Sequence, residues 1–463
     1  MSVDNSGGQA SRAATTESGT FSAGPCAWSL LPADCQRQVW ARLSAHDLAR
    51  CARTSRDFAA HVAERRSAAR SIVLPPGLSP AAVCGYVAAY AGAGEVSLRR
   101  CNLHLLQPHQ LQVLWASLAA GSAARATGVP VSAVDATSCF GLSDDDVADL
   151  CAALPDLRRF VVPNCPMESG FEAAKAAHAP EVPAAAAGGG NSGGGGLQEV
   201  CVDGCGDVRD AGVQALLRGG ASARTLTLLS ISRLDGITRA ALELNPRGVL
   251  RVLRACGCKR LDRVQMQLPP ASPLEELRLA GCANLHMVVL SAPRLLDLNV
   301  SSCAKLTTLS LATPSLRTLL ATGCKTLRGL GGAFPALREL NVFGCRQLET
   351  EALERALEGT PFLERLDVNG CIALGRLAPP QCMCLRTIIA TGCTSLRTVS
   401  CPSDALRSLA LHACAELVDV RLSTTQLRQL DLGNCGKLAR LAMPLLEAPA
   451  AQLRAAAEAA PEV

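Results

Sequence analysis

Cysteine is the residue type in this chain whose number and placement could do chemistry. The 463-residue sequence contains 23 cysteines, and thirteen of them recur at one position of a repeated pattern. Cysteine thiolates form disulfides, act as nucleophiles and bind zinc. His412, two residues before Cys414, adds a candidate thiol–imidazole couple. The spacing of the cysteines and the residues around them distinguish between these roles and a purely structural one.

The pattern reads L-x-x-L-x-L-x-x-C, and eight copies follow one another in register. They are Leu274–Cys282, Leu295–Cys303, Leu316–Cys324, Leu337–Cys345, Leu363–Cys371, Leu385–Cys393, Leu406–Cys414 and Leu427–Cys435. Less regular copies precede them, beginning at Ala69 and Ala93 and then covering Val131–Cys139, Leu157–Cys165, Leu197–Cys205, Ala223–Ile231 and Leu250–Cys258. A period of about 20 to 30 residues with this spacing is the signature of a leucine-rich-repeat solenoid. The sequence predicts about fifteen coils.

The repeat favours a structural role for the cysteines. Stacked coils lie about 4.8 Å apart, whereas the Cβ atoms of a disulfide prefer about 3.8 Å, and a straight row offers no tetrahedral shell for zinc. The C-x-C pairs at Cys256 and Cys382 lack a second pair at zinc-finger spacing. Strand alternation turns Cys414 inward and His412 outward. We therefore predict no catalytic, cofactor-binding or metal-binding residue, and no enzyme.

The distance between copies predicts what lies on the other side of each coil. Copies 21 residues apart, such as Cys303 to Cys324, have an apolar return segment without helical spacing, from Leu306 to Pro314. Copies 26 residues apart have room for a helix, as in 350–358. The predicted fold class is an α/β solenoid with a curved parallel sheet and a convex side that mixes helices with extended segments.

Composition and local sequence set the expected domain boundaries. Residues 1–25 read as disordered, 26–68 as a small helical segment, 69–440 as the solenoid and 441–463 as a C-terminal cap or tail. A low-complexity insertion at 168–196 is expected to loop out without a function. The net charge of +5 does not argue for nucleic-acid or membrane binding. No secretory signal or apolar run of 18 residues is visible, so a soluble cytoplasmic or nuclear protein is expected.

The helical segment at 26–68 resembles an F-box. The matching residues occur in this order: Leu31, Pro32, Val39, Trp40, Leu43, Asp47, Leu48, Thr54, Ser55, Arg56 and Phe58. The resemblance implies that Leu31, Pro32, Val39, Trp40, Leu43, Asp47 and Leu48 bind a Skp-type adaptor of a cullin–RING ubiquitin ligase. The sequence departs from the family at Cys35, Gln36, Thr54 and Phe58. The alternative is that these helices only cap the first coil.

Strand alternation also predicts which residues occupy the concave face. As a substrate-binding set we expect Glu276, Arg278, Asp297, Asn299, Glu339, Asn341, Phe343, Arg365, Asp367, Asn369 and His412. This face leans acidic from Asp297 to Asp367, and Phe343 is its aromatic residue and a candidate anchor. An ordinary solvated sheet is the alternative. The expected protein is a monomeric substrate adaptor within a Skp–cullin complex, or else a leucine-rich-repeat scaffold with no ubiquitin role.

Overall fold

The computed structural model describes one long repeat unit. The described residues are 69–74, 79–90, 92–99, 108–124, 129–137, 149–150, 153–163, 196–205, 208–218, 222–244, 248–380, 382–444 and 446–448. The expected disordered segment 1–25 and the F-box-like segment 26–68 lie outside them, and so do 168–195 of the predicted insertion and 449–463 of the tail.

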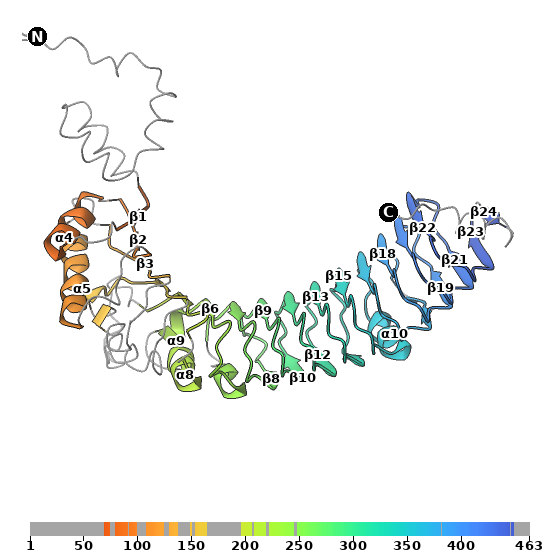
Figure 1. The fold of residues 1–463 in the computed structure, drawn as a ribbon, viewed down its shortest axis with the longest axis horizontal. Helices are drawn as coiled ribbons and strands as arrows, with labels where there is room; N and C mark the ends of the chain where they lie inside the picture. Colours follow the sequence, from red (N-terminus) through yellow and green to blue (C-terminus); the bar gives the residue numbers. More distant parts are fainter. Residues whose placement is uncertain are drawn as a thin grey trace, which may run out of the picture. The chain divides into compact units, whose positions relative to one another are not determined.

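Each predicted repeat contributes one strand to a 15-stranded parallel sheet (Figure 1). The strands are β1 (Ser71–Val73), β2 (Glu95–Ser97), β3 (Ala133–Asp135), β4 (Arg159–Val161), β5 (Glu199–Cys201), β6 (Leu228–Ser230), β7 (Val252–Arg254), β9 (Glu276–Arg278), β11 (Asp297–Asn299), β13 (Thr318–Leu320), β15 (Glu339–Asn341), β16 (Arg365–Asp367), β18 (Thr387–Ile389), β20 (Ser408–Ala410) and β22 (Gln429–Asp431). The fold is an α/β leucine-rich-repeat solenoid, because each strand pairs in parallel with the strand of the next coil.

The apolar positions of the repeat fill the interior. In each three-residue strand the middle side chain points inward, and the apolar residues just before and after the strand also point inward. In the coil of β9, for example, Leu274, Leu277 and Leu279 are all at most 1% exposed. One predicted register was wrong by three residues. Leu229 pairs with Val200 and Leu253, so the sixth copy runs from Leu226 to Leu234 and not over Ala223–Ile231. Leu234 fills its cysteine position and is fully buried.

The opposite side of the coils mixes strands and helices, as the spacing predicts. Two further sheets lie there: β8 (Arg263–Gln267), β10 (Met287–Ser291), β12 (Thr308–Ala312) and β14 (Gly329–Gly331), and then β17 (Arg376–Leu377), β19 (Thr398–Cys401), β21 (Asp419–Leu422), β23 (Arg440–Met443) and β24 (Leu446–Ala448). The helices are α4 (Pro80–Ala89), α5 (Pro108–Ala123), α8 (Asp210–Arg218), α9 (Ser222–Thr225), η3 (Arg239–Leu242) and α10 (Thr350–Glu358). Helix α10, in a 26-residue coil, contacts β14 and β17 and separates the two sheets. None of the helices in the described part of the chain is both long and apolar enough to cross a membrane.

A left-handed backbone residue lies three residues after the end of most strands of the long sheet. The residue before the repeat cysteine is commonly glycine, as at Gly281, Gly323 and Gly344, with φ values of 74°, 75° and 72°. Ser302 and Ala413 take the same conformation, with φ of 61° and 58°. Glycine adopts this conformation without the cost that a Cβ atom imposes. This turn aims the following cysteine into the interior.

Candidate protein-interaction surface

The long sheet presents one row of outward side chains per strand, and we call this the strand face. Register pairs Glu276 with Asp297 and Arg278 with Asn299, between β9 and β11. Strand β13 separates these residues from β15 and β16, where Glu339 pairs with Arg365 and Asn341 with Asp367. Phe343, Asn369 and His412 each lie two residues after their strands, β15, β16 and β20. The predicted substrate-binding residues are thus brought onto a single face, and their role in binding stays a prediction.

Three of those residues stabilise the ends of their own strands. The side-chain oxygens of Asn299, Asn341 and Asp367 accept hydrogen bonds from the backbone N–H groups two residues later, at 2.9, 3.0 and 3.1 Å. This is an Asx turn, whose signal in the sequence is Asn or Asp at the last strand position. Asp367 is only 9% exposed. The Asp367 carboxylate is therefore covered and engaged by backbone, and its role in substrate binding stays a prediction.

The remaining charges on the strand face are largely compensated by neighbouring strands. Glu276 lies 3.1 Å from Arg254 and 2.6 Å from Arg278. Glu339 lies 3.6 Å from Arg365. Since Glu339 is paired and Asp367 is buried, Asp297 is the acidic residue of the expected stretch from Asp297 to Asp367 that keeps an exposed carboxylate without a described ion-pair partner. Exposed pairs of this kind contribute little to stability, but they leave the centre of the face close to neutral.

Phe343 lies in this neutral region with 43% of its surface exposed. Its backbone carbonyl accepts a hydrogen bond from the Gly323 N–H of the preceding coil at 2.6 Å, and its own N–H donates to Asn341. The backbone of Phe343 is therefore held on both sides while its ring is free to contact a partner. An aromatic side chain on a fixed backbone loses little conformational entropy on binding.

The repeat cysteines form a buried hydrogen-bonded ladder. Ten of them are described, and each is 0% exposed. Each thiol donates to a backbone carbonyl of the preceding coil, as Cys324 does to Val300 at 3.1 Å and Cys345 to Ala321 at 3.2 Å. The ladder cysteines are Cys205, Cys258, Cys282, Cys303, Cys324, Cys345, Cys371, Cys393, Cys414 and Cys435. The thiols thus satisfy carbonyl groups inside the solenoid, where water has no access.

His412 does not activate the ladder thiol next to it. The Cys414 thiol donates to the Ala390 carbonyl at 3.1 Å. The imidazole of His412 instead lies 3.7 Å from the Asp431 carboxylate and 3.3 Å from the Asn434 side chain, both on the following coil. The predicted separation of thiol and imidazole is therefore correct.

A second buried polar row was not predicted. It lies three residues before the first leucine of several coils, where Ser403 donates to the Leu385 carbonyl and Thr424 to the Leu406 carbonyl, both at 2.9 Å. Cys382 occupies this row, 3.3 Å from the Thr360 hydroxyl, and is fully buried. The C-x-C pair to which Cys382 belongs is therefore split between the interior and the half-exposed Cys384. A recurring Ser, Thr or Cys at that spacing was the available signal.

Burial should shield the ladder cysteines from reagents in the native protein, because all ten described thiols are fully buried. Desolvation raises the pKa of the Cys324 and Cys393 thiols to about 11 and that of Cys345 to about 12. Since the thiolate is the nucleophile, these groups stay protonated between pH 7 and 9. We expect maleimide labelling, mapped by mass spectrometry, to modify the half-exposed Cys84 and Cys384 first and the ladder only after denaturation. Rapid native labelling of ladder peptides would contradict the inward placement.

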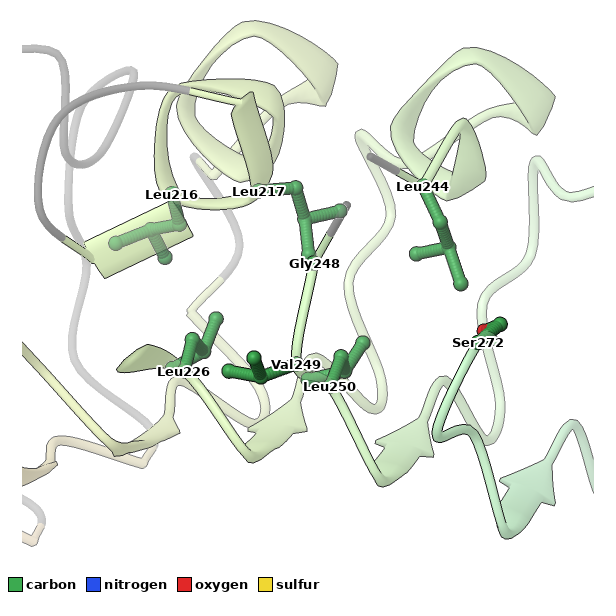
Figure 2. Close-up of a pocket in the computed structure, with 8 residues that line it drawn as sticks. All are labelled: Leu216, Leu217, Leu226, Leu244, Gly248, Val249, Leu250 and Ser272. Atoms are coloured by element: carbon green, nitrogen blue, oxygen red, sulfur yellow. The ribbon is translucent and has the colours of Figure 1, made fainter. Parts of the chain in front are cut away.

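One small apolar cavity lies beneath helix α8. It is lined by Leu216, Leu217, Leu226, Leu244, Gly248, Val249, Leu250 and Ser272 (Figure 2). Its volume of about 20 Å³ is close to the room that one water molecule needs. Within the described ranges, no group of three His, Cys, Asp or Glu side chains is arranged to hold a metal ion. The strand face is the candidate site, and near its N-terminal coils Glu95, Arg159 and Glu199 help to line a larger open pocket of about 470 Å³.

The comparisons with known proteins do not identify the protein. The sequence matches no protein-family model and no curated protein. Among solved structures it is similar to the yeast Rad7 and Elc1 complex, with 14% identity and a TM-score of 0.32 over 72% of this chain and 85% of that chain. It is also similar to the TLR13–ssRNA13 complex, with 12% identity and a TM-score of 0.30 over 76% of this chain. A leucine-rich-repeat protein of Bacteroides ovatus has 17% identity and a TM-score of 0.26, over 53% of this chain and 66% of that chain.

Similarity at this level carries no functional argument. The chain spans 61% of the length of the TLR13 chain. The assignment to the leucine-rich-repeat solenoids rests on the repeat and on the strand pairing of the chain itself.

Proposed function

We propose that this protein is a non-catalytic substrate-recognition adaptor of a Skp–cullin–F-box ubiquitin ligase. In this proposal the F-box-like segment binds a Skp-type adaptor and its cullin complex, while the strand face binds a protein substrate. The protein would act in the cytoplasm or nucleus as one copy within the complex. Transfer of ubiquitin would be performed by other subunits, and this chain would contribute proximity.

The observation that carries the proposal is the contrast between the inside and the outside of the coils. Inside, leucines and cysteines repeat with little variation, so the coils form a regular support. Outside, the strand-face residues differ from coil to coil, as Glu276, Thr318 and Arg365 do at one equivalent position. A varied surface on a uniform support suits recognition of a protein partner. The order of F-box-like residues from Leu31 to Phe58 supports the ubiquitin-ligase part of the proposal.

A second function follows if the F-box resemblance is only superficial. The chain would then be a leucine-rich-repeat scaffold whose residues 26–68 cap the array, and the strand face would still bind a protein. The two functions differ in one partner, the Skp-type adaptor.

A pull-down from cells separates these functions. Wild-type chain and a Leu31→Ala, Pro32→Ala variant are each tagged, and co-purifying proteins are identified by mass spectrometry. We expect the wild type to bring down a Skp-type protein and a cullin and the variant to lose both, since small side chains remove the apolar contacts of the motif. If the wild type recovers neither protein, the ubiquitin-ligase function is wrong and the scaffold function remains.

A further inference from the structure

Three arginines form a row near the C-terminal end of the long sheet, each directly before the first residue of its strand. Arg386, Arg407 and Arg428 occupy the second repeat position of three consecutive coils, and all three are exposed. Their backbones are directly stacked, since the N–H of Arg407 donates to the Arg386 carbonyl and the N–H of Arg428 to the Arg407 carbonyl, both at 2.8 Å. Parallel strands lie about 4.8 Å apart, so the Cα atoms of the three arginines lie along a line about 10 Å long. We call these three residues the arginine row.

The arginine row is only partly neutralised. At the same repeat position elsewhere, Arg251 lies 2.8 Å from Glu275, and Arg338 lies 3.2 Å from Glu364. Arg386 shares that glutamate, at 3.6 Å. Among the described residues, no carboxylate lies within ion-pair distance of Arg407 or Arg428. Two neighbouring cations without a counter-charge repel each other, so an anionic partner would bind there favourably.

The surroundings of the arginine row suit an extended peptide. Thr387, Ser408 and Gln429 follow the arginines by one residue on each strand and supply uncharged hydrogen-bonding groups. Met383, on the coil of Arg386, is 58% exposed and adds an apolar contact. Alternate side chains of an extended peptide are about 6.6 Å apart. Two acidic residues at alternate positions therefore fall within reach of Arg407 and one neighbouring arginine.

We propose that the arginine row binds an acidic segment of a protein partner in extended conformation. Each carboxylate would accept the paired N–H groups of one guanidinium, a geometry that arginine favours. This inference gives a partner chemistry to the protein recognition proposed above, and it does not depend on the ubiquitin-ligase role.

The charges around the row favour a peptide over a nucleic acid. Glu364 borders the row at one end, and the exposed Asp404 precedes Arg407 by three residues. A nucleic-acid strand carries a negative charge at every nucleotide and would bring phosphates close to these carboxylates. A peptide can place its acidic residues opposite the arginines and uncharged residues opposite the acids.

Peptide selection tests the proposal. The full-length chain is immobilised and used to select from a library of random 12-residue peptides, in parallel with an Arg407→Glu, Arg428→Glu variant. The control variant is Arg260→Glu, Lys325→Glu, which makes the same change in charge at two exposed residues elsewhere on the solenoid. We expect wild type and control to enrich peptides with Asp or Glu at alternate positions at least fivefold, and the row variant to lose this enrichment. Selected peptides should bind the row variant at least tenfold more weakly in fluorescence anisotropy.

The other outcomes overturn the inference. The inference is wrong if the wild type does not enrich acidic peptides, if the row variant enriches them as strongly as the wild type, or if the control variant loses the enrichment as completely as the row variant. A labelled 12-nucleotide oligouridine that binds wild type more tightly than the selected peptides, and loses binding in the row variant, would assign the row to nucleic acid. Circular dichroism confirms that each variant is folded. Recovery of a Skp-type adaptor by the row variant is measured separately, so failure of this inference and of the ubiquitin-ligase proposal remain distinguishable.

Discussion

Replacing Cys324 with alanine should lower the free energy of unfolding by about 2–3 kcal/mol, although the substitution removes a single sulfur atom. The Val300 carbonyl loses the thiol that donates to it at 3.1 Å. A buried acceptor left without a donor costs about 1–3 kcal/mol, and the space left by the sulfur adds a smaller cost. Cys324 is fully buried in the middle of the array, so solvent cannot replace the lost donor. Urea denaturation followed by circular dichroism measures the change.

Cys384→Ala is the matched control for that measurement. Cys384 is half-exposed and lies outside the ladder, so its replacement should change stability by less than about 0.5 kcal/mol. Equal effects of the two substitutions would mean that the ladder hydrogen bonds contribute nothing specific. Coils contact only their neighbours, so the Cys324 variant is also expected to unfold with a broader transition.

Replacing Phe343 with alanine should weaken binding of a protein substrate at least tenfold, which corresponds to about 1.4 kcal/mol. Phe343 is an exposed aromatic on the central part of the strand face, where the neighbouring charges are paired. Aromatic side chains in such positions often carry a large share of the energy of an interface. The folded state should be unaffected, because 43% of the residue is exposed and its hydrogen bonds come from the backbone.

Affinity capture of a substrate, followed by quantitative mass spectrometry, measures this effect. Val418→Ala is the control. Val418 has a similar exposed fraction, 41%, but it lies directly before β21 in the sheet on the opposite side of the coils. Unchanged capture by the Phe343 variant would place the substrate site elsewhere on the molecule. Loss of capture together with a lower melting temperature would indicate misfolding instead. Asp367 is left unchanged in this test because its carboxylate ends a strand, and its replacement would disturb the sheet itself.

Most of the fold could be predicted because the repeat fixes the interior. An apolar residue, most often leucine, at each inward position and a cysteine after the strand end determine the strands, the stacking direction and the burial of residues such as Leu277 and Cys282. Coil length likewise predicted helix α10 over Thr350–Glu358. The sixth copy was misplaced because Leu226 and Leu234 stand among other apolar residues, and only pairing with Val200 and Leu253 selects the register.

The sequence by itself determined which residues occupy the strand-face positions of each coil, because alternation along a strand is a local property. Only the tertiary structure decided what those residues do there. Glu276 is neutralised by Arg254, 22 positions away, and Arg407 stacks on Arg386, 21 positions away. Such contacts depend on which coils become neighbours and on their register, and no single repeat contains that information. The interior of this protein is thus encoded within each repeat, whereas its binding surface arises only when the coils stack.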